Sequence, residues 1–351
     1  MKIGILTSGG DCAGLNAVIR GFGKAIGVNP EVEIYGITGG YTGLINREYR
    51  QLKMGELSGI LDLGGTILGT SRQPYKELLQ FEENHKVAQM KENYRKMGLD
   101  VLVVLGGRGT HKTAALLSSE GLNVIGVPKT IDNDIWGTDF TFGFHSAVDV
   151  ATECIDRLRT TAASHGRIMV VEIMGNKVGW LTLYAGIGGG ADAILIPEIP
   201  YNMDSIVKFC HAIKKKGFGI IAVAEGTMDK DEADLSRKER MQKRAERNEV
   251  TVSNRIAKAI TEKLDIETRV VVPGHIQRGG SPSPYDRVIC TQMGVYAAKL
   301  AQEGRFGVTV ALNGDKMTSN NLAEIAVKKK FVPLKHELIH TARDVGISFG
   351  D

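Results

Sequence analysis

Short apolar runs alternate with amphipathic segments through most of the chain. The runs are KIGILTS, VLVVLGG, NVIGVP, RIMVVEI, AILIPEI, GIIAVAEG and RVVV, and each ends in glycine or a polar turn. Segments with helical periodicity, such as NAVIRGFGKAI and SIVKFCHAIKKKG, follow many of them. Apolar, β-branched runs that alternate with helices are typical of parallel sheets built from βαβ units. Ligands of such sheets bind beyond the carboxyl ends of the strands, so we expect a site in the turns that follow the runs.

The length of 351 residues predicts more than one domain, because a single core rarely keeps growing at this size. We expect one boundary near Asp139–Phe144, before the long helical segment SAVDVATECIDRLRTTAA, and another in the charged segment Asp229–Glu249. Acidic and basic residues interleave in that segment at spacings of three and four, which predicts a solvated helix. A nucleic-acid surface is the alternative, but the segment lacks aromatic residues and its acids dilute the basic charge.

The composition narrows the class of protein. Hydrophobic residues make up 42% and charged residues 24%, and the net charge of +4 suits anionic substrates without indicating nucleic-acid binding. Cys12, Cys154, Cys210 and Cys290 are widely spaced, which argues against a zinc site and a disulfide framework. No apolar run approaches the length that crosses a bilayer, and no signal-peptide pattern follows Met1. We therefore expect a cytoplasmic protein with neither a membrane nor a nucleic-acid partner.

Two glycine-rich turns have the residues of a phosphate-binding loop. The first, TSGGDCAGLNAVIR, lies between a predicted strand and a predicted helix. The second, LGGRGTHKTA, repeats the arrangement and adds Thr110 and Lys112 as donors. Glycine lets the main chain approach a phosphate, and a helix N-terminus favours anionic charge. A tight strand-to-helix turn would explain either loop alone, but two of them favour phosphate binding.

The heptapeptide PKTIDND follows the run NVIGV and carries Asp132 and Asp134, with Lys129, Thr130 and Asn133 beside them. Carboxylates two residues apart on an extended segment point to the same side. One of them can then accept a proton from a substrate hydroxyl while the other holds magnesium. An Asx-rich turn is the alternative interpretation of this segment.

Three further strand ends carry polar or small residues that could line a ligand cavity. His275 and Arg278 in PGHIQRGGSPSPYDR, with Arg269 on the preceding run, are typical of a second phosphate pocket. His275 taken singly could also be a buried core residue. The other candidates, in VEIMGNKVGW and VAEGTM, are Met174, Gly175, Asn176 and Glu225.

The motifs GGD-x-x-G-x-N, PKTIDND, SHGR, VEIMG, AEG and GHIQRGG, in this order, resemble the 6-phosphofructokinase family over nearly the whole chain. The branch that includes both ATP and pyrophosphate users is the most similar. The resemblance implies two Rossmann-like three-layer α/β/α domains with mainly parallel sheets and an active site in the cleft between them. Residues 1–143 and about 274–325 would form the phosphoryl-donor domain, and residues 144–273 and about 326–351 the fructose 6-phosphate domain.

The resemblance also implies phosphoryl transfer from ATP to the 1-hydroxyl of fructose 6-phosphate, the committed step of glycolysis. Asp132 would be the base, Thr130 would lie near the transferring group, and Asp134 with Asp132 would bind Mg²⁺. The donor would contact Gly10, Arg72, Gln73, Gly107, Arg108, Gly109, Thr110 and Lys129. The sugar phosphate would contact Thr130, Asp132, Arg167, Met174, Gly175, Asn176, Glu225, Arg269, His275 and Arg278. Arg167 and Arg269 match arginines that reach the substrate from a neighbouring subunit, which implies a homodimer or homotetramer.

Two residues depart from the family's pattern. Arg108 stands where relatives commonly have a magnesium-binding aspartate, and Asn176 stands where they have an arginine for the transferring phosphoryl. Arg108 could pair directly with donor phosphate oxygens, and Lys177 could supply the missing charge. The departures also leave open a weakly active regulator that binds sugar phosphate, although the base Asp132 is retained.

The donor is predicted to be ATP because of Gly109. In the family, a carboxylate side chain at this position fills space that the α-phosphate of ATP needs, and so favours pyrophosphate. Gly109 leaves that space open. Lys129 accompanies pyrophosphate use but also occurs in ATP-dependent members, so pyrophosphate remains the alternative donor. Steric exclusion is the stronger of the two arguments.

Overall fold

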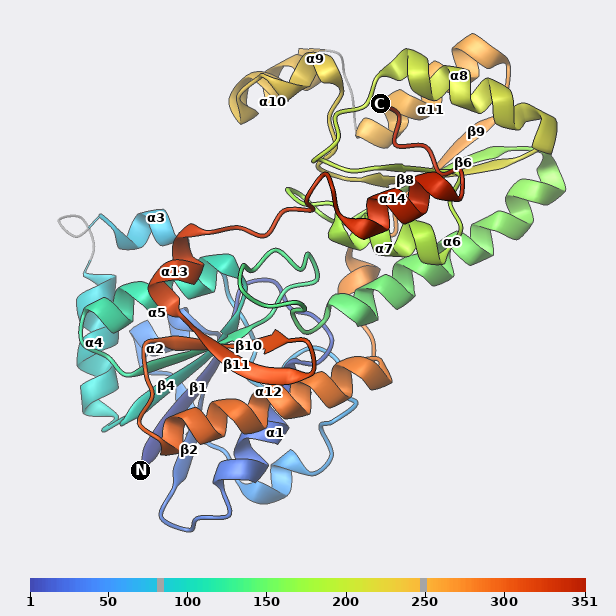
Figure 1. The fold of residues 1–351 in the computed structure, drawn as a ribbon. Helices are drawn as coiled ribbons and strands as arrows, with labels where there is room; N and C mark the ends of the chain where they lie inside the picture. The colour runs from blue at the N-terminus through green and yellow to red at the C-terminus, as the bar shows by residue number, and fades with distance from the viewer. Residues whose placement is uncertain (81–84, 247–250) are drawn as a thin grey trace. The chain divides into compact units, whose positions relative to one another are not determined.

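The computed structural model describes residues 1–80, 85–246 and 251–351. They divide into two compact units, of which the first comprises Met1–Ser146 with Arg278–Lys330 and the second Ala147–Gln277 with Phe331–Asp351. Both are α/β units with mainly parallel sheets, which confirms the predicted fold class (Figure 1). The charged segment Asp229–Glu249 lies inside the second unit, so the expected boundary there is wrong; its residues 247–249 lie outside the described residues.

A seven-stranded sheet in the order β11-β10-β5-β4-β1-β2-β3 forms the centre of the first unit. The two end pairs, β2 with β3 and β10 with β11, are antiparallel, and the remaining pairs are parallel. Its strands are β1 (Lys2–Ser8), β2 (Glu33–Ile37), β3 (Tyr49–Gln51), β4 (Val101–Gly106), β5 (Val124–Pro128), β10 (Val308–Asn313) and β11 (Lys316–Asn321). Its helices are α1 (Leu15–Ile26), α2 (Tyr41–Asn46), η1 (Met54–Leu57), α3 (Tyr75–Leu78), α4 (Lys86–Lys96), α5 (Arg108–Ser119), α12 (Pro284–Gln302) and α13 (Leu322–Val327).

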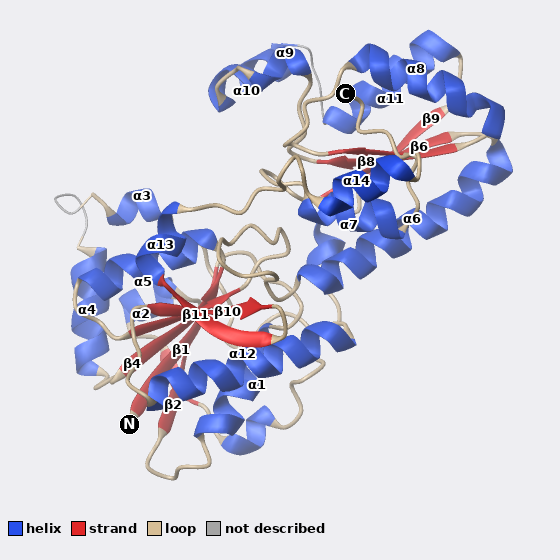
Figure 2. Cartoon of the chain, in the orientation of Figure 1, coloured by secondary structure: helices blue, strands red, loops and turns tan. Residues whose placement is uncertain are grey.

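Helices cover both faces of this sheet (Figure 2). On one face, buried residues of α2, α4 and α5 pack against Leu102 and Val104 of β4 in one hydrophobic cluster. On the other face, α1 and α12 cross closely because glycines stand at the contact. A Cβ at Gly21 would lie 2.8 Å from the main-chain oxygen of Thr291, and one at Gly294 only 2.5 Å from that of Val18. Any side chain at either position would separate the two helices.

The second unit is built on a parallel four-stranded sheet in the order β7-β8-β6-β9. Its strands are β6 (Ile168–Ile173), β7 (Ala193–Leu195), β8 (Gly219–Ala224) and β9 (Thr268–Val271). Its helices are α7 (Trp180–Gly188), α8 (Met203–Ile213), η2 (Lys214–Lys216), α9 (Lys230–Ala233), α10 (Arg237–Glu246), α11 (Val252–Leu264) and α14 (Glu337–Asp344). The chain enters this unit within α6 (Phe144–His165) and leaves it within η3 (Gly274–Arg278).

The core of the second unit packs α8 and α11 against the sheet. Ile206 and Cys210 of α8 and Ile256 and Ile260 of α11 contact apolar residues of β6, β7 and β8. The strand expected over AILIPEI ends early, at Leu195. The helix that follows the VLVVLGG run, α5, begins at Arg108.

The solvated helix expected in the charged segment is partly wrong. The described part forms two helices, α9 and α10, and Glu232 of α9 is 0% exposed. Its carboxylate accepts from Arg244 Nη2 at 2.7 Å and from Arg255 Nη1 at 3.2 Å. The charge pattern of a solvated helix therefore does not indicate that one of these charges, Glu232, is buried in an ion cluster.

Candidate functional site

Three turns leave the first sheet side by side. The parallel register pairs Ser8 of β1 with Gly106 of β4, and Gly106 with Pro128 of β5. The two glycine-rich turns and the PKTIDND segment follow these three residues directly. The strand ends thus bring together the three segments that the sequence predicted as phosphate-binding or catalytic.

The first glycine turn is fixed by the segment at residues 70–71. Gly9 has φ +88° and donates its N–H to the Ser71 oxygen at 2.9 Å, while Thr70 Oγ1 donates to the Gly9 oxygen at 2.7 Å. These bonds hold the expected donor residues Arg72 and Gln73 next to the turn. Arg72 is exposed, and Gln73 donates from Nε2 to Glu77.

The second turn is the N-terminus of α5. Gly107 is the N-cap, and Arg108 and Gly109 form the first turn of the helix, so the expected loop is largely helical. Within the part of the chain that the structure describes, a Cβ built at Gly109 meets nothing within 4 Å. In the same part, the Nε of Arg108 is buried without a hydrogen-bond partner. The Thr110 hydroxyl is buried and donates to the Ser8 oxygen at 3.2 Å, so it joins the two turns.

Lys129 connects all three segments. Its N–H donates to the Gly106 oxygen at 3.0 Å, and its Nζ donates to the Gly10 oxygen. Burial lowers the pKa of Lys129, while the carboxylates of Asp132 and Asp11 act in the opposite direction. A buried cation with neighbouring acids suits a site that receives phosphate.

The PKTIDND segment is not extended, so the premise that Asp132 and Asp134 lie on an extended segment is wrong, and the segment forms the turn of the alternative interpretation. β5 ends at Pro128, and the residues beyond it form a turn in which Asn133 has φ +51°. The Asn133 Oδ1 accepts from the Thr141 N–H at 3.1 Å, and the Asp132 N–H donates to Thr130 Oγ1 at 3.0 Å. Side-chain bonds of this kind favour a turn over a strand. Asp132 and Asp134 are both partly exposed.

Arg278 belongs to the first unit, although it was predicted together with residues of the second. Its Nη1 donates to the main-chain oxygen of Asp11 at 3.1 Å, and a Cβ at Gly10 would lie 3.0 Å from the same atom. Its Nε is buried and has no hydrogen-bond partner among the residues that the structure describes. The guanidinium therefore lies beside the first glycine turn.

In the second unit, the expected substrate residues lie at the carboxyl ends of neighbouring strands. The register pairs Ile173 of β6 with Ala224 of β8, and Met174 and Glu225 follow directly. The Glu225 N–H donates to the Ile173 oxygen at 2.9 Å. A Cβ at Gly226 would lie 2.0 Å from the Asn176 oxygen, so the two turns are in close contact.

Gln277 fixes the first of these turns to η3. Gln277 is buried, accepts from the Met174 N–H at 3.2 Å and donates from Nε2 to the Gly274 oxygen at 3.1 Å. Gly175 has φ +138° and leaves no room for a Cβ, which would lie 2.7 Å from the Val178 oxygen. His275 is exposed, so it is not the buried core histidine of the alternative interpretation.

Arg167 and Arg269 lie at the opposite side of the same sheet, where its strands begin. Arg167 precedes β6, and Arg269 lies near the start of β9, beside Met169 in the register. Both donate to Glu267, Arg167 from Nε at 2.6 Å and Arg269 from Nη2. The length of β6 separates them from Met174, so the second unit does not bring these arginines to the other expected substrate residues.

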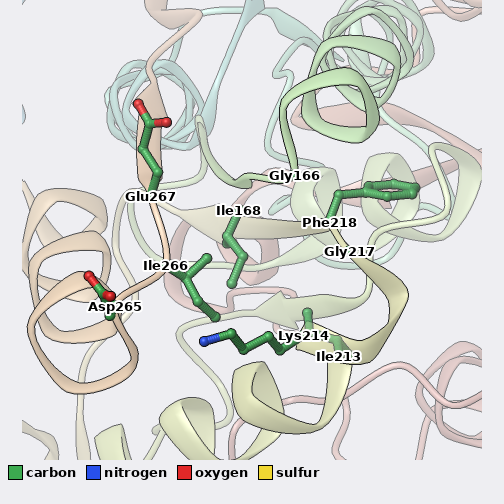
Figure 3. A pocket seen from close by; sticks show the side chains of 9 residues that line it. All are labelled: Gly166, Ile168, Ile213, Lys214, Gly217, Phe218, Asp265, Ile266 and Glu267. Atoms are coloured by element: carbon green, nitrogen blue, oxygen red, sulfur yellow. The ribbon is translucent and has the colours of Figure 1, made fainter.

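A pocket of about 230 Å³ opens at this edge, close to the two arginines. Ile168, Ile213 and Ile266 gather with Lys214 in its centre, as Figure 3 shows. The remaining lining residues are Gly166, Gly217, Phe218, Asp265 and Glu267. None of the expected site residues lines this pocket.

Three residues with polar contacts in these clusters were not predicted from the sequence. Asp11 lies in the GGD motif, which is the signal that could have suggested it. Gln277 stands inside GHIQRGG but was passed over in favour of its charged neighbours. His111 of α5 is buried and bonds Gly107 and Thr309, and no local sequence signal indicates the second contact.

The described residues contain neither a cluster of metal-binding side chains nor a helix that could cross a membrane. Within residues 1–80, 85–246 and 251–351, no three His, Cys, Asp or Glu side chains are grouped so that they could hold a metal ion. Over the same ranges, no helix combines the length and the apolar character needed to span a bilayer.

Comparison with known proteins agrees with the motifs. The phosphofructokinase family model matches residues 2–301. An ATP-dependent 6-phosphofructokinase of Spirochaeta thermophila is 54% identical, covering 99% of this chain and 97% of its own. ATP-dependent 6-phosphofructokinase 3 of Bacteroides thetaiotaomicron is 47% identical over the full length of both. The phosphofructokinase structure from Saccharomyces cerevisiae superposes with a TM-score of 0.79 at 32% identity, covering 93% of this chain and 45% of that one. The chain therefore belongs to the phosphofructokinase family, as its motifs predicted.

Proposed function

We propose that the chain transfers the terminal phosphoryl group of ATP to the 1-hydroxyl of fructose 6-phosphate, giving fructose 1,6-bisphosphate. The observation that carries the proposal is the position of Lys129, whose Nζ contacts Gly10 and whose N–H bonds Gly106. It joins two glycine turns and the proposed base segment at one edge of the first sheet. The relatives named as ATP-dependent 6-phosphofructokinases over the full chain support the same reaction.

The first unit is the proposed donor-binding unit. Main-chain N–H groups at the start of α5 and at Gly10 would bind phosphate oxygens, with Lys129 offsetting their charge. The Arg108 Nε is buried without a partner, which fits a guanidinium that pairs with a phosphate oxygen. Arg72, Gln73, Gly107, Gly109 and Thr110 complete the proposed set, Thr110 through its main chain because its hydroxyl bonds Ser8.

ATP is the proposed donor because the space beside Gly109 is open. A Cβ there meets no atom of the described residues within 4 Å, which supports space for the additional phosphate of ATP beside Gly109. Pyrophosphate is the second candidate, and the burial of Lys129 at Gly10 favours it. Lys129 would neutralise the charge of either donor, whereas the space at Gly109 is needed only by ATP.

Mg²⁺ is the proposed metal ion, held by Asp132 and Asp134. Both carboxylates are partly exposed on the turn after β5. Mg²⁺ usually takes one or two carboxylates and completes its shell with water and substrate phosphates, so two carboxylates fit it without a third protein ligand. When bound, the ion would neutralise charge on the transferring group. Arg108 offers no ligand atom and would add positive charge beside it.

Asp132 is the proposed base, which would take the proton of the sugar hydroxyl. Its main-chain N–H is fixed by the Thr130 hydroxyl, so the turn sets the position of the carboxylate. General-base catalysis needs such positioning more than an unusual pKa. Thr130 lies two residues before it and would lie near the transferring phosphoryl group.

The second unit is the proposed sugar-phosphate unit. Met174, Gly175, Asn176, Glu225 and His275 all follow the carboxyl ends of its strands. Arg167 and Arg269 lie at the other edge of that sheet, a strand length away, which supports their serving the site of a second copy. The active form would then be a homodimer or homotetramer. We propose the cytoplasm as its compartment because the reaction belongs to glycolysis.

The proposal is tested with purified protein, Mg²⁺ and fructose 6-phosphate, by comparing kcat/KM with ATP and with pyrophosphate. A higher kcat/KM with ATP supports the proposed donor. A higher value with pyrophosphate would instead make pyrophosphate the donor and the reaction a reversible one. Binding of fructose 6-phosphate without turnover with either donor would instead support a regulator.

A further inference from the structure

His111 lies beneath the second glycine turn, in the first turn of α5. Its side chain is 0% exposed. Nδ1 lies 3.0 Å from the Gly107 oxygen, and Nε2 lies 2.8 Å from Thr309 Oγ1 on β10. The main-chain N–H of His111 donates to the same Gly107 oxygen at 3.0 Å. One residue therefore bonds the Gly107 carbonyl twice.

The contacts define the tautomer of the ring. A carbonyl oxygen only accepts, so Nδ1 must carry the proton and donate to Gly107. Burial lowers the pKa of His111 to about 4, and the nearby Lys129 ammonium acts in the same direction, so the ring is neutral. Nε2 is then an acceptor, and the Thr309 hydroxyl donates to it.

Neighbouring residues leave space for this arrangement. A Cβ at Gly126 of β5 would lie 2.9 Å from both His111 Nε2 and Thr309 Oγ1, so a larger residue would displace the pair. Gly107 is the N-cap of α5 and, without a side chain, makes no side-chain cap bond. The ring of His111 thus holds the start of α5 in place, which the N-cap residue Gly107 cannot do through a side chain.

The Gly107 carbonyl determines where the next N–H points. The peptide unit between Gly107 and Arg108 is planar and trans, so its C=O and N–H point in opposite directions. Bonds that draw the carbonyl inward along α5 turn the Arg108 N–H outward, beyond the helix N-terminus. That is the direction from which a helix N-terminus binds phosphate.

We propose that His111 is a positioning residue for the phosphoryl donor, whose Nδ1–H holds the Gly107 carbonyl and so directs the Arg108 N–H at the donor phosphates. The inference rests on the proposed function, because it assumes that the donor binds at α5. His111 itself touches no ligand and acts through the Gly107–Arg108 peptide.

Two substitutions test the roles of the two ring nitrogens separately. His111→Asn keeps a nitrogen at the position of Nδ1, and His111→Gln keeps a polar atom only near the position of Nε2. We expect His111→Gln to raise the KM for ATP and the Kd of a non-hydrolysable imido analogue of ATP with Mg²⁺ about tenfold, as for the loss of one hydrogen bond. His111→Asn should retain both values within about twofold, and the KM for fructose 6-phosphate should stay unchanged in both variants.

Thr309→Val is the matched control, because it removes the partner of Nε2 and leaves the bond to Gly107. It should lower thermal stability without changing the Kd of the analogue. The inference would be overturned if His111→Asn and His111→Gln weakened binding of the analogue equally, or if neither variant weakened it. A wild-type protein that binds the analogue but transfers no phosphoryl group would refute the proposed function, while the binding series would still decide on His111. Absence of analogue binding by the wild type would overturn both.

Discussion

Arg278 Nη1 donates a 3.1 Å hydrogen bond to the main-chain oxygen of Asp11, 267 residues earlier in the chain. The bond joins GHIQRGG to the first glycine motif within one unit. Among the described residues, Nε of Arg278 is buried without a hydrogen-bond partner, which costs free energy unless a ligand supplies the acceptor. We expect that acceptor to be a phosphate oxygen.

Arg278→Ala should raise the KM for fructose 6-phosphate about tenfold or more, because charge-assisted hydrogen bonds to phosphate are lost. The KM for ATP should rise less, through loosening of the turn at Gly10 and Asp11. Steady-state kinetics with each substrate varied in turn measures both values. Arg287→Ala is the control, since the Arg287 side chain donates to the main-chain oxygen of Pro282 and to the hydroxyl of Ser281 and lies outside the proposed site. A rise confined to the KM for ATP would move Arg278 to the donor site.

Asp132→Asn should lower kcat by about 10³-fold, since a positioned general base typically contributes 10² to 10⁴. The amide keeps the shape of the side chain, and the turn is held by main-chain and Thr130 contacts, so the protein should fold. Calorimetry should find the affinity for fructose 6-phosphate within a fewfold of the wild type. Turnover at the wild-type rate would remove Asp132 from the role of base.

Gly109→Asp should lower kcat/KM for ATP about tenfold more than kcat/KM for pyrophosphate, because the new carboxylate enters space that only the larger donor needs. The open surroundings of Gly109 make the variant structurally acceptable. Gly109→Ala controls for the loss of glycine and should change the ratio of the two values little. Equal losses with both donors would contradict the steric explanation of donor choice.

The sequence predicted those parts of the fold that local patterns determine. Apolar runs became β1, β4, β5, β6 and β8, because buried parallel strands require continuous apolar residues. β11, with the sequence KMTSNN, was not predicted, since it is a polar edge strand that depends on pairing with β10. The buried Glu232 was missed for a similar reason, because its charge pattern is that of a solvated helix until Arg255 joins it from another helix.

The candidate site, like the fold, was predicted only where local sequence patterns determine it. The glycine turns were predictable because close approach to phosphate requires glycine, and the register of the strands then places them together. The shape of PKTIDND was offered only as the alternative, an Asx-rich turn, and this turn forms because the bonds of Asn133 to residues 139 and 141 outweigh the extended preference of the preceding strand. The contact of His111 with Thr309 spans 198 residues, so no local pattern could indicate it.

Glu232→Gln should lower the free energy of unfolding by about 3 kcal/mol, because it leaves the Arg244 and Arg255 guanidinium groups without their shared buried counter-charge. Urea denaturation measures the change. Glu153→Gln is the control, because it breaks an exposed pair with Arg157 whose loss should scarcely move the denaturation midpoint. A Glu232→Gln midpoint equal to that of the control would show that the cluster adds nothing to stability.

The pH dependence of stability should reflect His111. Burial lowers its pKa to about 4, against about 6.5 in the unfolded chain. The unfolded state therefore binds the proton first, so stability from the neutral ring is fully present above about pH 6.5 and is lost as the pH falls towards 4. The loss amounts to about 3 kcal/mol over that window.

Urea denaturation at several pH values between 4 and 7 measures this slope. His145 acts in the same direction, because burial also lowers its pKa to about 4, so the wild type loses stability through both histidines. His111→Asn removes one titrating group. The slope of the free energy of unfolding against pH should therefore fall by the contribution of about one proton. An unchanged slope in His111→Asn would mean that His111 takes up its proton at the same pH in the folded and unfolded states, which contradicts a neutral histidine held between Gly107 and Thr309.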